Sequence, residues 1–188
     1  MNMMSRVNRS GSLEIMRIRG VQVFVHWSVL VIAALILLRM YKDPLLWIVT
    51  VVSYMGVLLL HESGHMIAAQ RRRYEVLAIE LYPVYGITLL ESPASRIDRD
   101  VIAWGGIVAQ LVVAVPLVIH FYIFGATRYA GLNAAMTVFG FYSVFIAFFN
   151  LIPMRPLDGG TAWDLIPALI QRARTTHTNP SVRYRSPR

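Results

Sequence analysis

Long runs of apolar residues, separated by short polar segments, organise the chain. We expect four of these runs to form membrane-spanning helices, because each approaches or exceeds the length that crosses a bilayer. They are Val21 to Leu38, Leu45 to Gln70, Val101 to Phe124 and Ala130 to Phe149. The connections after the first and third runs are short and carry turn residues. The pattern predicts an all-α polytopic membrane protein with about four transmembrane helices.

The segment between the second and third runs differs from the other connections. It encloses an apolar piece, Ile79 to Leu90, that is too short to cross a bilayer and contains Pro83 and Gly86. Its Ile, Leu, Tyr and Val residues favour strands. We therefore predict a short re-entrant β-hairpin at the membrane edge, between the second and third helices.

Composition and charge agree with a membrane protein. Of the 188 residues, 56% are hydrophobic and 15% are charged, and the formal net charge is +8. The positive charges flank the apolar runs and form no stripe on one folded face, which argues against a nucleic-acid partner. The chain has no cysteine, so any metal ion must be held by His, Asp or Glu side chains.

Arginine clusters predict the orientation of the chain, because arginines of short loops stay on the cytoplasmic side. They lie near the N-terminus, at residues 71–73 and within residues 172–188. We therefore expect a multi-pass protein of the cell membrane with both termini in the cytoplasm. The expected organisation is a basic cytoplasmic segment (1–20), a transmembrane core (21–171) and a basic disordered cytoplasmic tail (172–188).

The second run ends in an unusual polar sequence, His61-Glu62-Ser63-Gly64-His65, with no charge between Leu45 and His61. Two histidines four residues apart lie on one helix face and can bind one Zn²⁺, while the adjacent Glu62 can accept a proton from metal-bound water. Ionisable groups in a membrane segment are costly, so a functional role is the default. The structural alternative is a surface helix end with two unrelated histidines.

Asp158 is the candidate third ligand. It follows the fourth run, in a stretch where Pro153 and Pro156 prevent regular helix. On the expected topology, the fourth run ends at the membrane depth of the two histidines. One alternative is that Asp158 only caps a helix beginning at the following glycines. Another is a different membrane zinc protease with Glu80 or Glu91 as third ligand, which would leave Asp158 unexplained.

The two motifs together resemble the site-2 protease family of intramembrane zinc metalloproteases. They are His61-Glu62-Ser63-Gly64-His65 and Asn150-x-x-Pro153-x-x-x-x-Asp158-Gly159. The resemblance implies that His61, His65 and Asp158 bind one zinc ion per chain and that Glu62 is the general base. It also implies that residues 21–171 are the metalloprotease core of a minimal member without a PDZ or CBS domain.

Three further residues are candidates for substrate binding. Asn150 precedes the proline-rich loop and, as the resemblance suggests, positions the substrate or the oxyanion. Gln110 stands where many family members carry the asparagine of Gly-Pro-x-x-Asn, and it offers the same amide on a longer stem. Gly86 would let another backbone approach, so that the hairpin pairs with substrate as an added strand. Val25-His26-Trp27 resembles a stretch of the family's first helix.

The resemblance implies hydrolysis of peptide bonds in transmembrane or membrane-associated protein substrates, near the cytoplasmic side, as in regulated intramembrane proteolysis. The expected partners are such a substrate, the lipid bilayer and a regulatory membrane protein. A rival interpretation from another class is a membrane metal-binding transporter or a catalytically inactive scaffold. In that case His61, Glu62 and His65 would line an ion path.

Overall fold

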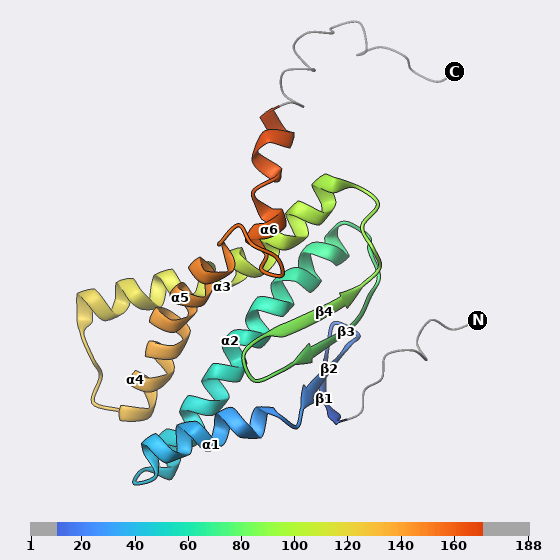
Figure 1. Cartoon of the computed structure of the whole chain (residues 1–188). Helices are drawn as coiled ribbons and strands as arrows, with labels where there is room; N and C mark the ends of the chain where they lie inside the picture. Colours follow the sequence, from blue (N-terminus) through green and yellow to red (C-terminus); the bar gives the residue numbers. More distant parts are fainter. Residues whose placement is uncertain (1–10, 171–188) are drawn as a thin grey trace, which may run out of the picture.

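The computed structural model describes residues 11–170, in which long helices lie beside a four-stranded sheet (Figure 1). The helices are α1 (Val29–Met40), α2 (Pro44–Arg71), α3 (Arg96–Phe124), α4 (Ala130–Thr137), the π-helical segment η2 (Val138–Tyr142), α5 (Ser143–Asn150) and α6 (Gly159–Ala162). The strands are β1 (Ser12–Ile18), β2 (Val21–His26), β3 (Val76–Leu81) and β4 (Gly86–Leu90). The expected tail, 172–188, lies outside the described residues.

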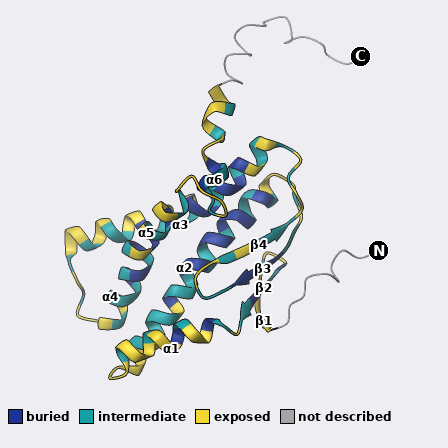
Figure 2. Ribbon diagram, in the orientation of Figure 1, coloured by how far each residue is buried: buried dark blue, intermediate teal, exposed yellow. Residues whose placement is uncertain are grey.

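Three helical segments are long and apolar enough to cross a membrane: α2, α3 and the continuous rod Ala130–Asn150 formed by α4, η2 and α5. They contain 28, 29 and 21 residues, against the roughly 20 that a bilayer requires. Many of their outward-facing residues are exposed and apolar (Figure 2). The second, third and fourth predicted runs are therefore confirmed as membrane-length helices.

The first predicted run, Val21 to Leu38, is wrong as a single helix. Its first residues form strand β2, and α1 has only 12 residues. At 1.5 Å per residue, α1 is about 18 Å long, short of the roughly 30 Å hydrocarbon thickness. The count of four spanning helices is not confirmed. Likewise, Val25-His26-Trp27 lies at the end of β2 and in the turn after it, and not in a helix.

The fold class all-α also needs correction, because a small sheet accompanies the helices. Its order is β1-β2-β3-β4, with antiparallel outer pairs and a parallel β2–β3 pair. The predicted hairpin is confirmed as β3 and β4, and the N–H of Tyr82 closes its turn on the carbonyl of Tyr85 at 2.9 Å. Among residues 11–170, β4 has one neighbouring strand, β3, so its other edge is unpaired there.

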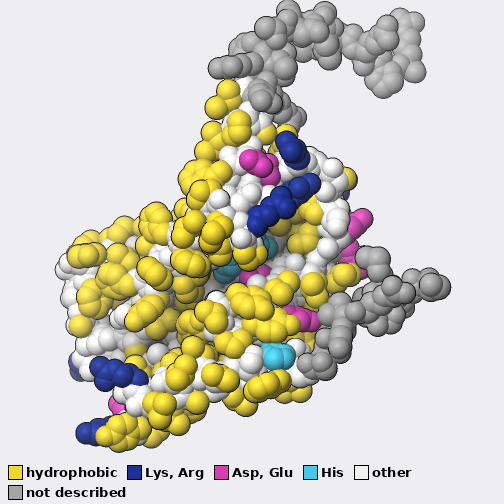
Figure 3. All heavy atoms as spheres, viewed as in Figure 1, with side chains coloured by type: hydrophobic (Ala, Val, Ile, Leu, Met, Phe, Trp, Pro, Cys, Tyr) yellow, Lys and Arg dark blue, Asp and Glu magenta, His cyan; other side chains and the backbone are white. Residues whose placement is uncertain are grey.

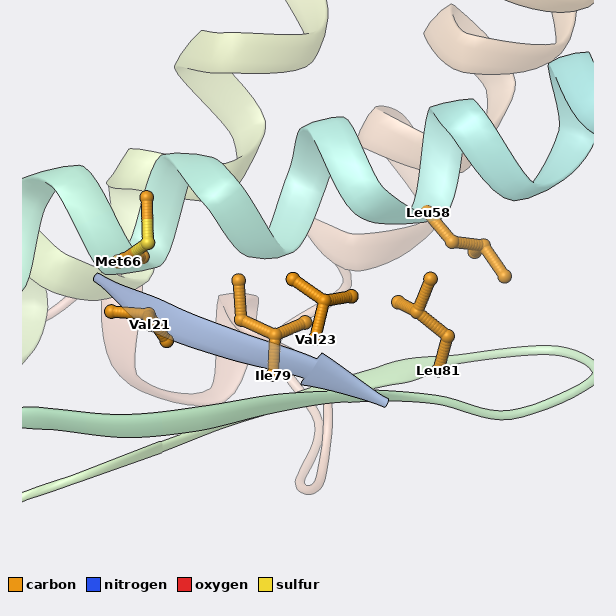
Figure 4. Packing of buried hydrophobic residues seen from close by; sticks show 6 residues of the cluster. All are labelled: Val21, Val23, Leu58, Met66, Ile79 and Leu81. Carbon is orange, nitrogen blue, oxygen red and sulfur yellow. The ribbon is translucent and has the colours of Figure 1, made fainter. Parts of the chain in front are cut away.

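The sheet packs on α2 through one face. Alternate residues of β2 and β3 point toward the helix, because the side chains of a strand alternate between its two faces. With two residues of α2 they form a buried apolar cluster (Figure 4): Val21, Val23, Leu58, Met66, Ile79 and Leu81. This cluster brackets the sequence His61 to His65 and fixes the sheet beside it.

Helix α3 crosses α2 closely at a pair of glycines. A Cβ added at Gly105 would lie 2.6 Å from the carbonyl oxygen of Gly64, and a Cβ at Gly64 would collide with the carbonyl of Gly105. Small residues let two membrane helices approach to backbone contact. The crossing point therefore falls within the His61 to His65 segment.

Candidate metal centre and active site

The two histidines lie one turn apart on α2 and face the same point. Their Nε2 atoms are 3.0 Å apart, and the ring planes meet at 88°. His61 is 7% exposed and His65 is 8% exposed. Helical spacing thus brings two imidazole nitrogens to one buried position, as the sequence predicts.

Asp158 completes the group from a distant part of the chain. Its Oδ2 lies 3.0 Å from Nε2 of His61 and 3.3 Å from Nε2 of His65. Although Asp158 occupies the N-cap position of α6, its side chain makes no capping hydrogen bond. The carboxylate faces the histidines, which disfavours the capping alternative.

Each imidazole is held by a hydrogen bond from its Nδ1. Nδ1 of His61 donates to Oε1 of Gln110 at 3.0 Å, and Nδ1 of His65 donates to the carbonyl oxygen of Ile102 at 2.8 Å. A neutral imidazole carries one N–H, so a donating Nδ1 leaves Nε2 with a lone pair. Both lone pairs are therefore directed toward Asp158, the arrangement typical of metal-binding histidines.

The donor set fits a zinc ion. The ligand atoms of His61, His65 and Asp158 all lie within 4.8 Å of one another. Two Nε2 lone pairs and a carboxylate oxygen are acceptors, so their convergence requires a cation between them. Apart from the histidines, the buried Oδ2 of Asp158 has no hydrogen-bond partner in the described part of the chain. Within residues 11–170, His61, His65 and Asp158 form the one group of three His, Asp or Glu side chains that could hold a metal ion. Neither Glu80 nor Glu91 belongs to it.

The electrostatics of Asp158 also suit a metal ligand. Burial disfavours its charged form, but the adjacent His61 and His65 outweigh this effect and hold its pKa below the usual range. The carboxyl group is thus an anion beside the histidines and can bind a cation.

A glycine on α3 makes room for the two rings. A Cβ at Gly106 would lie 2.5 Å from Nε2 of His65 and 2.7 Å from Cε1 of His61. The consecutive Gly105 and Gly106 therefore serve two purposes: the first admits the backbone of α2, and the second admits its histidines.

Glu62 lies against strand β4 and is 4% exposed. The hydroxyl of Thr88 lies 2.7 Å from Oε2 of Glu62 and 3.1 Å from its backbone oxygen. Gly86 lies beside the same side chain, because a Cβ there would be 2.6 Å from Oε1. In the space-filling view, histidine and acidic side chains are visible in a hollow between β4 and the α6 region (Figure 3).

Comparisons with known proteins agree with this arrangement. The family model for peptidase family M50 matches residues 117–184, which include Asp158. A zinc metalloprotease of Methanocaldococcus jannaschii is 23% identical over 151 residues, covering 79% of this chain and 43% of that protein. Stage IV sporulation protein FB of Bacillus subtilis is 29% identical over 140 residues, covering 66% of this chain and 46% of that protein.

Among solved structures, the site-2 protease from Methanocaldococcus jannaschii has the same fold. It matches with a TM-score of 0.66 at 21% identity, over 86% of this chain and 72% of that chain. The chain thus has the fold of that site-2 protease, and its residues 117–184 are similar to peptidase family M50. Its three membrane-length helices indicate a multi-pass membrane protein. The chain spans less than half the length of the curated relatives that it matches.

The other residues predicted for the site differ in their contacts. Asn150 is the last residue of α5, directly before the loop that carries Asp158. Gln110 touches His61 through its oxygen, whereas its Nε2 is buried without a partner among the described residues. Two other histidines have partners outside this group: His26 contacts Ser28, and His120 packs on Phe124.

Sequence reasoning missed two residues of the site: Thr88, which acts through its hydroxyl, and Ile102, which acts through its carbonyl. A threonine in a short apolar strand carries no signal of its own. A backbone carbonyl carries none in any sequence. Both contacts depend on how β4 and α3 pack on α2.

Proposed function

We propose that the chain is an intramembrane zinc metalloprotease that hydrolyses peptide bonds of transmembrane or membrane-associated proteins. The observation that carries this proposal is the convergence of Asp158 with His61 and His65, which lie on a helix of bilayer length beside Glu62. One zinc ion per chain would be held by these three ligands. A site with three protein ligands leaves a position for water or substrate, as catalytic zinc sites do.

The residues divide the chemistry between them. Zinc, when bound, supplies Lewis acidity that makes water nucleophilic near neutral pH and polarises a carbonyl. Glu62 accepts the proton of the attacking water and later delivers it to the leaving amine. Gln110 and the Ile102 carbonyl hold the two imidazoles in the tautomer that a metal requires.

Substrate must reach this site as an extended chain. The carbonyls of a membrane helix are locked in intrahelical hydrogen bonds, so the segment to be cut has to unwind. Its exposed N–H and C=O groups then need hydrogen-bond partners, and the unpaired edge of β4 offers backbone groups that can pair with them. We infer that the substrate adds to β4 as a strand, with Gly86 allowing its close approach.

We assign two side-chain amides to substrate binding. Nε2 of Gln110 is a buried donor with no partner among the described residues, which favours a contact to a substrate carbonyl. Asn150 stands at the end of α5, where an amide would position the substrate or the oxyanion.

The cut lies near the cytoplasmic side on this proposal. His65 is six residues before the end of α2, or about 9 Å along the helix, and three arginines follow at residues 71–73. Arginines of this kind favour the cytoplasm. Cleavage there would release a cytoplasmic portion of the substrate, which is the chemistry of regulated intramembrane proteolysis in the cell membrane. A regulatory membrane partner would then control access.

The decisive experiment is a cleavage assay in proteoliposomes with a single-span substrate, comparing the wild type with Glu62→Gln. We expect the variant to keep stoichiometric zinc and to lose at least about a hundredfold in rate, because general acid–base groups contribute roughly 10²–10⁴. Asp158→Ala should lose both zinc and activity, whereas Glu80→Ala and Glu91→Ala should keep zinc.

Three results would contradict this assignment. Unchanged turnover in zinc-loaded Glu62→Gln would remove the glutamate from the mechanism. Zinc binding without proteolysis in the wild type would favour the transporter or scaffold. Loss of zinc in Glu80→Ala or Glu91→Ala, with retention in Asp158→Ala, would favour a glutamate-ligand site.

A further inference from the structure

Strand β4 contacts Glu62 on α2 at two points. The Thr88 Oγ1 is 2.7 Å from Oε2 of Glu62, and Gly86 faces Oε1 so closely that a Cβ would lie 2.6 Å away. The two carboxylate oxygens are therefore each set against a different residue of the same strand.

The register of the sheet places both residues on this face. Gly86 pairs with Leu81 and Thr88 pairs with Ile79, and both partners belong to the cluster packed on α2. Side chains of a strand alternate in direction, so Gly86 and Thr88 point toward α2 with their partners. Any shift of one residue would replace Thr88 at Glu62 with Ile87 or Leu89.

The hydroxyl of Thr88 has one proton and two acceptors within reach. The carboxylate oxygen at 2.7 Å is closer than the backbone oxygen of Glu62 at 3.1 Å. An ionised carboxylate only accepts hydrogen bonds, and a hydroxyl bond to it is stronger than one to a neutral carbonyl. The proton therefore goes to Oε2. Oε1, beside the side-chain-free Gly86, is left to receive a proton from water.

We propose that Thr88 is a positioning residue for Glu62: its hydroxyl holds Oε2 and thereby directs Oε1 to the reacting water. This inference rests on the proposed function and deepens it. It gives β4 a catalytic task besides substrate pairing. Because a misplacement of about 1 Å can cost roughly a hundredfold in rate, loss of this hydrogen bond should act on catalysis and not on metal binding.

The test compares three variants of the full chain in the proteoliposome assay. Thr88→Val removes the hydroxyl at nearly constant shape, and Thr88→Ser retains it. Thr50→Val is the matched control. Thr50 lies on α2, the helix that carries Glu62, but its hydroxyl donates to the carbonyl of Leu46 at 2.8 Å, away from Glu62. Zinc content and thermal stability are measured for each.

We expect Thr88→Val to lower kcat between about tenfold and a hundredfold with KM, zinc content and stability unchanged. Thr88→Ser should recover most of the lost kcat, and Thr50→Val should match the wild type. Wild-type kcat in Thr88→Val, equal losses in Val and Ser, or loss of zinc or stability in step with activity would overturn the positioning role. An inactive wild type would instead overturn the proposed function on which it rests.

Discussion

A buried amide on α3 controls the orientation of one metal-binding imidazole. Gln110 is fully buried, and its Oε1 accepts the Nδ1–H of His61 at 3.0 Å. His65 has a backbone carbonyl in the equivalent place, which no side-chain change removes. The two histidines therefore differ in their sensitivity to mutation, and His61 alone depends on a side chain for its tautomer.

Substitutions at Gln110 should separate zinc binding from substrate binding. Gln110→Leu removes the acceptor, and we expect zinc to bind about 10–100-fold more weakly, as for other residues that orient metal ligands. Gln110→Glu keeps an acceptor but loses Nε2, so zinc affinity should stay near wild type while KM rises. Competition with a calibrated chelator measures the first effect, and cleavage kinetics measure the second. Unaltered zinc affinity in Gln110→Leu would contradict the orienting role.

At the scale of single residues, the sequence predicts the chemistry of the site better than the contacts between its residues. His61, His65 and Asp158 could be predicted as one group because their residue types and their places in the apolar pattern already describe a metal site. The hydrogen-bond partners of Glu62 and His61 could not be predicted in this way. Thr88 and Gln110 lie 26 and 49 positions further along the chain. Their contacts follow from strand register and helix crossing, which no local pattern encodes.

Among the elements, length decides what could be predicted. Helices α2 and α3 are long apolar runs, which admit few other structures in a membrane. Strand β2 has valine at alternate positions, which favours a strand, but the apolar residues of α1 follow it so closely that the whole run has the length of a membrane helix. Pairing with β1 and β3 decides in favour of the strand, because it satisfies the backbone of β2 on both sides.

The same pairing rules identify which backbone groups of β4 face its unpaired edge. Tyr82 and Tyr85 share a hydrogen bond across the turn, as do Glu91 and Glu75 at the other end of the hairpin. Hydrogen-bonded and non-hydrogen-bonded pairs alternate along an antiparallel ladder. Gly86, Thr88 and Leu90 therefore direct their N–H and C=O groups outward, where a substrate strand would add.

Leu90→Pro tests strand addition without touching Glu62. Proline lacks the outward N–H but leaves the bonds to β3 in place, since those come from the alternate residues. We expect slower cleavage of a transmembrane substrate at unchanged zinc content, whereas Leu90→Ala, which keeps the N–H, should cleave normally. Steady-state rates with both variants provide the measurement. Equal rates for proline and alanine would contradict substrate pairing along this edge.

Among the described residues, 11–170, positive charges gather at two opposite ends of an apolar surface (Figure 3). The end with the metal centre is the richer in arginine: Arg71, Arg72, Arg73, Arg96, Arg99 and Arg155. The other end, where α1 meets α2 and α3 meets α4, has Arg39, Lys42 and Arg128. This asymmetry favours the metal-centre end in the cytoplasm.

Single-cysteine labelling tests this orientation directly, because the chain contains no native cysteine. We expect Lys42→Cys and Arg128→Cys to react with an impermeant maleimide on intact cells, and Arg73→Cys and Arg155→Cys to react only after permeabilisation. Reporters fused before Met1 and after Arg188 should both report the cytoplasm. Cleavage by each variant is the control for native folding. External labelling at Arg73 or Arg155 would move the metal centre to the outer side. If Lys42→Cys and Arg128→Cys were labelled on opposite sides of the membrane, α2 and α3 would not cross the membrane as a pair. That result is incompatible with their contact at Gly64 and Gly105.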